Sequence, residues 1–565
     1  MSIAPKATLV RPHRRSTQAV ARARVSELRT WLQTSESQPV RLVETHISWV
    51  LLADALAYKI KKPVRLPFLD FSTLAARRRY CDEELRLNRR LAPSLYLDVV
   101  NIRDSPDGPR FGGVGRVLEV AVCMRRFPDG ALWSEKLIAG SLAPRHIDAM
   151  AQRLSDFHRD AAVAPPGSAF GSAAIHERVT RRLIDGIEAW RSESASPGIS
   201  VDWPALRAWL ITQQESLAPL WEVRRHENRV RECHGDLHLA NVIQLGSDAT
   251  AFDGIEFDPN LRWIDVLDDL AFLAMDLLAH GQRGLAFRLV AAYLEASGDY
   301  DGLPALRFHM VCRALVRAQV TAIGQGQGAH SVARCGPSDY LALASVLSGS
   351  ADARLAITHG LPGSGKSFVS QGLLEETAAI RVRSDVERKR LFGLGALQSS
   401  HELVAGGIYD TATTARTYAQ LQAVARVALG AGWPVIVDAA FLRRSERAEF
   451  AALAASLALP FSIIDCRADL PLLRKRLERR LAEGADPSEA DVAVLELLSR
   501  LDEPLDEHDH AVTIVVDAAH PQAPATIAQR WLAAGREVLE PGRAAASESA
   551  GCQTSYLNDS DTLAR

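Results

Sequence analysis

Residues 360–367 read G-L-P-G-S-G-K-S, and these residue types at this spacing suit phosphate binding. Glycines let successive backbone N–H groups turn inward around phosphate oxygens, and a following helix adds its positive N-terminal end. In this Walker A pattern Lys366 reaches the β- and γ-phosphates, and the Ser367 hydroxyl ligates Mg²⁺. The candidate phosphate-binding residues are Gly360, Gly363, Ser364, Gly365, Lys366 and Ser367.

Further polar residues follow this loop at positions where they could act on phosphate. Asp438 ends the apolar run V-I-V-D, where a carboxylate could hold Mg²⁺ or cap a helix. Asp385, in I-R-V-R-S-D, could accept a proton from a substrate hydroxyl or serve as an N-cap. Arg476 and Arg480 share one helix face, which predicts either a clamp on transferring phosphate or a solvated basic face.

A second motif, H-G-D-L-H-L-A-N at residues 234–241, contains an Asp and an Asn five residues apart. On a tight loop these types divide the work of phosphoryl transfer. Asp236 would orient or accept the proton of a substrate hydroxyl, and Asn241 would ligate Mg²⁺. The spacing matches the catalytic loop of protein kinases, with Gly235 in place of an arginine.

A second metal carboxylate should follow this loop one hairpin later. We favour Asp253, in A-F-D-G, and keep Glu256 and Asp258 as alternatives because I-E-F-D also offers carboxylates at a strand end. Asp265 and Asp269 are expected to anchor the loop and cap the next helix.

Upstream, a strand lysine should meet the α- and β-phosphates and pair with a helix glutamate. Lys59 and Lys61 lie on the same face of one strand because side chains alternate, so either could do this. Glu84 is the candidate partner. No G-x-G-x-x-G loop precedes Lys59, where the chain reads W-V-L-L-A-D-A-L-A-Y.

The elements that would position these residues fall into two groups. Strand patterns at 47–64 and 115–127 flank a charged helix at 74–92; helices at 134–225, a short hairpin at 234–257 and helices at 263–347 follow, which predicts a two-lobed α+β unit. After residue 353, four short apolar strands alternate with helices, which predicts an α/β domain with a parallel sheet. We divide the chain into a basic N-terminal arm (1–35), a first domain (36–350), a P-loop domain (351–540) and a disordered tail (541–565).

Both halves resemble known families. G-L-P-G-S-G-K-S, S-D at 384–385, V-D-A-A-F and the R-x-x-x-R helix resemble the small P-loop kinases, which include polynucleotide 5′-hydroxyl kinases and zeta-toxin-like proteins. H-G-D-L-H-L-A-N resembles the aminoglycoside phosphotransferase-like family, which has a protein-kinase-like fold. Together with Y-K-I-K-K-P-V and E-L-R-L-N-R-R-L-A, it is similar to bacterial proteins that fuse such a domain to a P-loop kinase. The resemblance implies ATP and Mg²⁺ as cofactors.

Composition narrows the function classes. The 565 residues carry a formal net charge of −2, which gives no general attraction to nucleic acid or anionic membrane. No apolar run of about 18 residues predicts a membrane span. The seven cysteines are scattered, as expected for reduced thiols in a cytoplasmic protein.

We therefore expect an ATP-dependent phosphotransferase with two nucleotide sites and a hydroxyl-bearing small molecule as acceptor. Two alternatives remain open: one active P-loop kinase or ATPase regulated by a non-catalytic kinase-like domain, and a nucleic-acid 5′-end kinase. Oligomeric state and acceptor identity do not follow from the residues.

Overall fold

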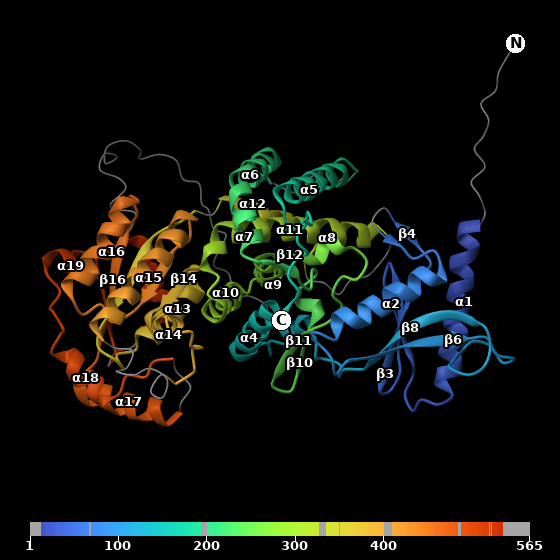
Figure 1. The fold of residues 1–565 in the computed structure, drawn as a ribbon, viewed down its shortest axis with the longest axis horizontal. Coiled ribbons are helices and arrows are strands. Elements are labelled where there is room, and N and C mark those ends of the chain that lie inside the picture. Colours follow the sequence, from blue (N-terminus) through green and yellow to red (C-terminus); the bar gives the residue numbers. More distant parts are fainter. Residues whose placement is uncertain are drawn as a thin grey trace, which may run out of the picture.

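A computed structural model describes residues 13–66, 69–193, 201–326, 335–349, 351–399, 410–483, 487–518, 520 and 522–534. The expected tail at 541–565 lies outside these residues. Figure 1 shows three parts in a row: a sheet lobe (13–125, blue), a helical lobe (126–349, green) and the P-loop domain (351–534, yellow to red). None of the described helices is long and apolar enough to cross a membrane.

The sheet lobe contains an antiparallel sheet with strand order β1-β2-β3-β8-β6-β7. Its helices cover opposite faces: α1 buries Val25 and Leu28 with Trp49, whereas α2 buries Cys81 with Val120. Residues 13–33, expected in a basic arm, are thus a helix packed on the sheet. The elements are α1 (His13–Gln33), β1 (Arg41–Glu44), β2 (Ser48–Leu52), β3 (Leu56–Lys61), β4 (Arg65–Leu66), β5 (Leu69–Asp70), α2 (Leu74–Asn88), β6 (Tyr96–Arg103), β7 (Arg110–Phe111) and β8 (Val117–Arg125).

The helical lobe contains the helices and the one short hairpin that the pattern after residue 134 predicted, together with a second two-stranded antiparallel sheet. Its helices are α3 (Trp133–Ile138), α4 (Pro144–Asp160), α5 (Ala173–Glu193), α6 (Trp203–Ser216), α7 (Ala218–His226), α8 (Pro259–Arg262), α9 (Val266–Ala279), α10 (Arg283–Ser297), α11 (Leu303–Gly326) and α12 (Pro337–Gly349), with short 3₁₀ turns at Leu239–Asn241 and Tyr300–Gly302. Its strands are β9 (Val230–Glu232), β10 (Val242–Leu245), β11 (Asp248–Ala251) and β12 (Trp263–Asp265). Strand β10 pairs with β11, and β12 pairs with β9.

The P-loop domain has a parallel sheet in the order β14-β15-β13-β16-β17, so the expected α/β class is confirmed. Strand β14 was missing from the four expected strands because arginines alternate with its apolar residues. The elements are β13 (Leu355–His359), α13 (Lys366–Thr377), β14 (Ile380–Arg383), α14 (Ser384–Arg390), α15 (Thr411–Gly430), β15 (Val435–Asp438), α16 (Arg444–Ser456), β16 (Phe461–Arg467), α17 (Leu470–Glu483), α18 (Val492–Ser499), α19 (Glu507–Ala511), β17 (Thr513–Asp517) and α20 (Pro524–Ala533).

The helical lobe and the P-loop domain share one continuous apolar core. Helix α10 lies at the junction in Figure 1, and it packs against α4 and α9 on one side and against α13 and β14 on the other. Trp433 inserts across the boundary: its ring lies 5.8 Å from that of Phe287, and its Nε1 donates to the Leu303 carbonyl at 3.2 Å. The junction is therefore a packed interface.

Candidate active sites

The phosphate-binding loop leaves the central strand β13 and enters helix α13, the setting that the Walker A pattern requires. Gly360, Gly363 and Gly365 have φ angles of 132°, 83° and 99°, which favour glycine. A Cβ atom on Gly360 would lie 2.5 Å from the carbonyl oxygen of Cys466 on the neighbouring strand. The loop path therefore depends on glycine for both conformation and space.

Lys366 begins α13 and folds over the loop. Its Nζ donates to the carbonyl oxygens of Gly360 and Leu361, each at 2.9 Å. Burial lowers the pKa of this ammonium group below its usual value, and nearby Asp438 partly opposes the shift. A half-buried, loop-bound cation at this point is suited to meet phosphate oxygens in place of the carbonyls.

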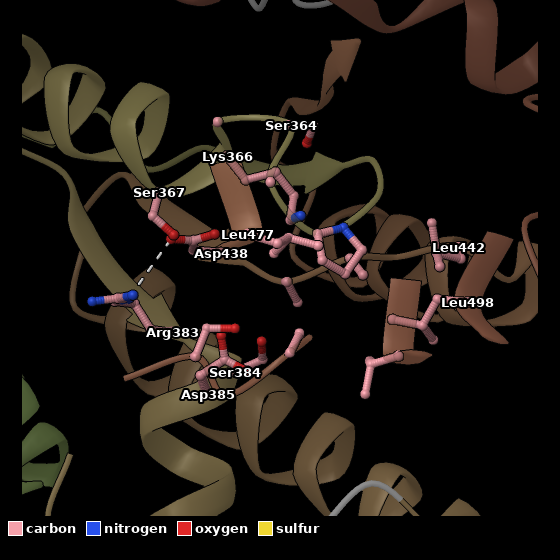
Figure 2. Close-up of a pocket in the computed structure, with 18 of the residues that line it drawn as sticks. Ser364, Lys366, Ser367, Arg383, Ser384, Asp385, Asp438, Leu442, Leu477 and Leu498 are labelled. Carbon is pink, nitrogen blue, oxygen red and sulfur yellow. Dashed lines mark ion pairs between the residues drawn. The ribbon is translucent and has the colours of Figure 1, made fainter. Parts of the chain in front are cut away.

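Asp438 is the last residue of β15 and is buried. Its Oδ2 accepts from the Ser370 hydroxyl at 3.0 Å and lies 3.8 Å from Nε of Arg383. The alternative of a helix-capping role is wrong, because the residue ends a strand and α16 begins at Arg444 with Arg443 as its N-cap. In Figure 2, Ser367 and Asp438 lie at the same end of the cavity. Their oxygen atoms are the donor type that Mg²⁺ prefers, so this pair fits the metal.

Asp385 lies in the first turn of α14 and lines the cavity that adjoins the P-loop. The N-cap of this helix is Arg383, without a capping side-chain hydrogen bond, so the N-cap alternative for Asp385 is wrong. Figure 2 shows Ser384 and Asp385 across the cavity from Lys366. The carboxylate thus faces space that an acceptor hydroxyl could occupy.

Three arginines of α17, Arg476, Arg479 and Arg480, also line this cavity. Arg476 Nη1 donates to the Gly363 carbonyl at 3.1 Å, and Arg480 Nη2 donates to the Ala490 carbonyl at 2.6 Å. Arg474, on another face, pairs with Glu496 at 3.0 Å, and both side chains are more than half exposed. Arg474 therefore belongs to a solvated basic face of the helix, whereas Arg476 contacts the P-loop.

The cavity has a volume of about 940 Å³ and combines the P-loop with an apolar wall. Leu442, Leu477 and Leu498 contribute to this wall; in Figure 2 Leu477 lies near Lys366, and Leu442 and Leu498 lie on the side away from Ser367 and Asp438. Sequence reasoning missed these leucines and also Arg383, Arg388 and Glu446. Only Arg383 had a signal, because it stands two residues before Asp385 in the same short stretch; the others come from helices and loops that no motif marks.

The candidate site in the N-terminal part of the chain centres on a buried charge cluster between the antiparallel sheet and α2. Glu84 forms ion pairs with both lysines: its Oε1 lies 2.9 Å from Lys59 Nζ, and its Oε2 accepts a hydrogen bond from Lys61 Nζ at 2.6 Å. Lys59 also contacts Asp253, and Lys61 contacts Glu256. Burial opposes ionisation of Glu84, but the two lysines outweigh it and hold the pKa of its carboxyl well below the usual range.

The two candidate lysines and the candidate metal carboxylates differ in their exposure and in their contacts. The Asp253 side chain is 40% exposed and reaches Lys59, whereas the Lys61 side chain is only 1% exposed and meets the buried Glu256. Lys59 and Asp253 therefore form the open side of the cluster. Asp258 caps α8 by accepting from the Asn260 backbone N–H at 2.9 Å, so its side chain is used in the local turn.

The loop at 234–241 is held by carboxylates from α9. Asp269 accepts from the backbone N–H groups of His234 and Gly235, each at 2.8 Å, and Asp265 caps α9, as expected. Asn241 Nδ2 donates to Asp236 Oδ2 at 3.1 Å. Burial favours the neutral form of Asp236, but nearby His238 and Arg317 shift the pKa of its carboxyl below the usual value. Asp236 is thus hydrogen-bonded to Asn241, and its neighbours favour the carboxylate form.

Comparisons with known proteins find relatives that match most of the chain and a family model that matches the P-loop domain. Uncharacterized protein Rv2004c of Mycobacterium tuberculosis is 30% identical over 453 residues, which are 80% of this chain and 88% of that protein; Mb2027c of Mycobacterium bovis matches equally. The sequence model of the AAA domain family matches residues 355–505.

Solved structures resemble each part at low similarity. An ethanolamine kinase of Plasmodium vivax is 12% identical, with 55% of this chain and 81% of that chain covered and a TM-score of 0.34. A gluconokinase of Sinorhizobium meliloti is 20% identical, with 32% and 90% covered and a TM-score of 0.23. The chain combines a two-lobed α+β unit with an α/β domain that contains the P-loop.

Proposed function

This chain belongs to the same protein family as Rv2004c of M. tuberculosis, and from that premise we propose that it is an ATP-dependent phosphotransferase. In the proposed reaction the P-loop domain transfers the γ-phosphoryl group of ATP to a hydroxyl of a small molecule. The observation that supports it most is the cavity of about 940 Å³ in which the P-loop, Asp385, Asp438 and Arg476 meet. Its volume lies in the range of small-molecule sites.

The residues divide the work of the transfer. The acceptor oxygen attacks the γ-phosphorus while Asp385 takes the hydroxyl proton, and the bond from that phosphorus to the β–γ bridging oxygen breaks to leave ADP. Lys366, Arg476 and Arg480 stabilise the charge on the phosphoryl oxygens. Mg²⁺, held by Ser367 and Asp438, supplies further charge neutralisation when it is bound.

The first domain, proposed as residues 36–350, contributes a second site of the protein-kinase type. Asp236 orients the acceptor hydroxyl, Asn241 and Asp253 hold Mg²⁺, and Lys59 meets the phosphates with Glu84 as its partner. The contacts of Asp236 with Asn241 and of Lys59 with Glu84 support these roles. The P-loop domain, proposed as residues 351–540, then forms the other half of a two-site enzyme.

Nucleotide-binding stoichiometry tests the two sites separately. We expect the full-length protein to bind two ATP molecules in calorimetric titrations, and Lys366→Ala to bind one because its phosphate cation is gone. Asp236→Asn should retain both binding events but lose the phosphate transfer that depends on the first site. Lys475→Ala, an exposed lysine on α17, is the matched control and should behave as the wild type. Full binding stoichiometry in Lys366→Ala would refute the P-loop assignment.

One observation favours a second candidate function. Lys59 directly contacts Asp253, so the cation and the carboxylate proposed for phosphate and metal are engaged with each other. In this alternative the first domain binds and regulates, and only the P-loop domain transfers phosphate. It predicts that every transfer measured with a panel of hydroxyl acceptors, including 5′-hydroxyl oligonucleotides, persists in Asp236→Asn and disappears in Lys366→Ala.

A further inference from the structure

The last turn of α10, in the helical lobe, meets a row of arginines from the P-loop domain. Glu295 Oε1 accepts from Arg381 Nε at 3.1 Å and from Arg381 Nη2 at 2.8 Å. Its Oε2 lies 4.0 Å from Arg383 Nη1, and its backbone carbonyl accepts from Arg390 Nη2 at 2.7 Å. The Glu295 side chain is only 14% exposed, so these interactions are little screened by solvent.

Arg381 and Arg383 also contact residues of the phosphate-binding site. Arg383 Nε lies 3.8 Å from Asp438 Oδ2, the ion pair drawn as a dashed line in Figure 2. Arg381 Nη1 donates to the Ser367 carbonyl at 3.5 Å. Arg383 is therefore shared between a carboxylate of the first domain and a carboxylate of the P-loop domain.

The position of Arg383 between two carboxylates has a consequence for Asp438. At the low effective dielectric of a buried site, a guanidinium shared by two anions moves toward the one that remains if the other is neutralised. Loss of the Glu295 charge would therefore draw Arg383 onto Asp438, where it would compete with a cation for the same oxygen atoms. Residues that orient metal ligands without touching the metal typically change metal affinity by about 10- to 100-fold.

We propose that Glu295 is a positioning residue of the P-loop site, supplied by the first domain. It holds Arg381 and Arg383 back so that Asp438 and Ser367 are available to ligate Mg²⁺. The inference rests on the proposed function of the P-loop site and adds a role for the first domain that is independent of its own catalysis. The P-loop site is complete only when α10 is packed against β14.

The test compares two charge-neutralising variants of the same interface in the full-length protein. Glu295→Gln removes the carboxylate that faces Arg381 and Arg383. Glu375→Gln is the matched control: Glu375, on α13, pairs with Arg288 of α10 at 2.9 Å across the same junction. The measurement is the Mg²⁺ concentration that gives half-maximal binding of a fluorescent ADP analogue, with Lys366→Ala defining the share of binding due to the P-loop site.

We expect Glu295→Gln to raise this Mg²⁺ concentration by roughly 10-fold, the lower end of the range for residues behind metal ligands, and to leave Mg²⁺-free nucleotide affinity unchanged. Glu375→Gln should match the wild type. Equal shifts in both variants, or no shift in Glu295→Gln, would overturn the inference.

A double variant separates positioning from a general loss of packing. In Glu295→Gln/Arg383→Gln the competing guanidinium is absent, so the Mg²⁺ requirement should return toward the wild-type value. If the double variant needs as much Mg²⁺ as Glu295→Gln or more, the proposed role of Arg383 is wrong. If the wild type itself shows no Lys366-dependent nucleotide binding, the proposed function fails instead, and the two failures are distinguishable.

Discussion

Gly360 shows at the scale of one residue how strictly the phosphate-binding loop is shaped. Its φ of 132° and the 2.5 Å approach of a Cβ atom to the Cys466 carbonyl leave no room for a side chain. Backbone strain of this kind costs roughly 1–3 kcal/mol. The loop and the strand beside it must therefore shift when any other residue stands here.

We predict that Gly360→Ala lowers ATP affinity at the P-loop site at least 10-fold and lowers the melting temperature of the protein. Gly395→Ala is the control, because a Cβ atom there meets open space and the backbone has no positive φ. Calorimetric titration and thermal unfolding of both variants give the result. Wild-type affinity in Gly360→Ala would show that the loop adapts easily and that the close approach is unimportant.

At the scale of elements, the buried Arg224 ties three segments of the helical lobe together. From α7 it contacts Asp265, the N-cap of α9, and donates to both carboxylate oxygens of Asp299, which follows α10, at 2.8 Å. Burial would raise the pKa of Asp265, but Arg224 outweighs it and lowers the pKa to about 2. The network fixes the start of α9, which carries the carboxylates that hold the 234–241 loop.

Arg224→Met should destabilise the protein by about 3–5 kcal/mol at neutral pH, because two buried carboxylates lose their cation. The sign of the pH dependence follows from the lowered pKa of Asp265. In the wild type its contribution is complete above the ordinary value of 3.8 and is lost as the pH falls toward about 2. In the variant burial dominates and raises the pKa, so protonation relieves the cost.

The difference in unfolding free energy between wild type and Arg224→Met should thus shrink as the pH falls through the raised pKa of Asp265 in the variant toward about 2, its pKa in the wild type. Urea unfolding at a series of pH values measures it. A difference that stays constant from pH 7 to pH 3 would contradict the assigned role of the ion pair.

The whole molecule behaves as a unit if the junction at α10 and α11 is as well packed as its contacts indicate. Trp433 is buried there: it bonds to Leu303, packs near Phe287 and stacks under Arg307, whose Cζ lies 4.3 Å from the ring centroid. An apolar interface between two domains couples their unfolding, whereas domains without such an interface unfold independently.

We expect the wild type to unfold in one calorimetric transition and Trp433→Ala to unfold in two, after a loss of about 3–5 kcal/mol at the interface. Trp531→Ala, which removes an equally buried tryptophan inside the P-loop domain, should lower the melting temperature without splitting the transition. Two transitions in the wild type, or one in Trp433→Ala, would mean that the junction does not couple the domains.

Local sequence patterns were sufficient to predict much of the fold of this protein. The strand–loop–helix at 360–367 and the parallel sheet around it follow from local residue types, because phosphate-binding loops use neighbouring backbone groups. The two-lobed unit and its charged helix, expected at 74–92 and observed at 74–88, follow from periodicity, which reports the side of an element that is buried. The anchoring roles of Asp265 and Asp269 were also predicted. Asp265 caps the helix that follows it, whereas Asp269 accepts from the backbone N–H groups of His234 and Gly235, 35 and 34 positions away.

Glu84 was predicted from the sequence as the partner of a strand lysine, but tertiary structure decided the partners of other buried charges. Arg381 meets Glu295 across 86 positions of sequence, and Lys61 meets Glu256 across 195. Strand β14 was hidden for the same reason, since its arginines look solvent-facing until α10 supplies their carboxylate. Sequence pattern and spacing describe one element at a time. The packing of distant elements decided the contacts of Asp253 and Glu256, the surroundings of Asp438 and the position of Glu295. The physical reason is that a buried charge is stabilised only by the partner that packing brings to it.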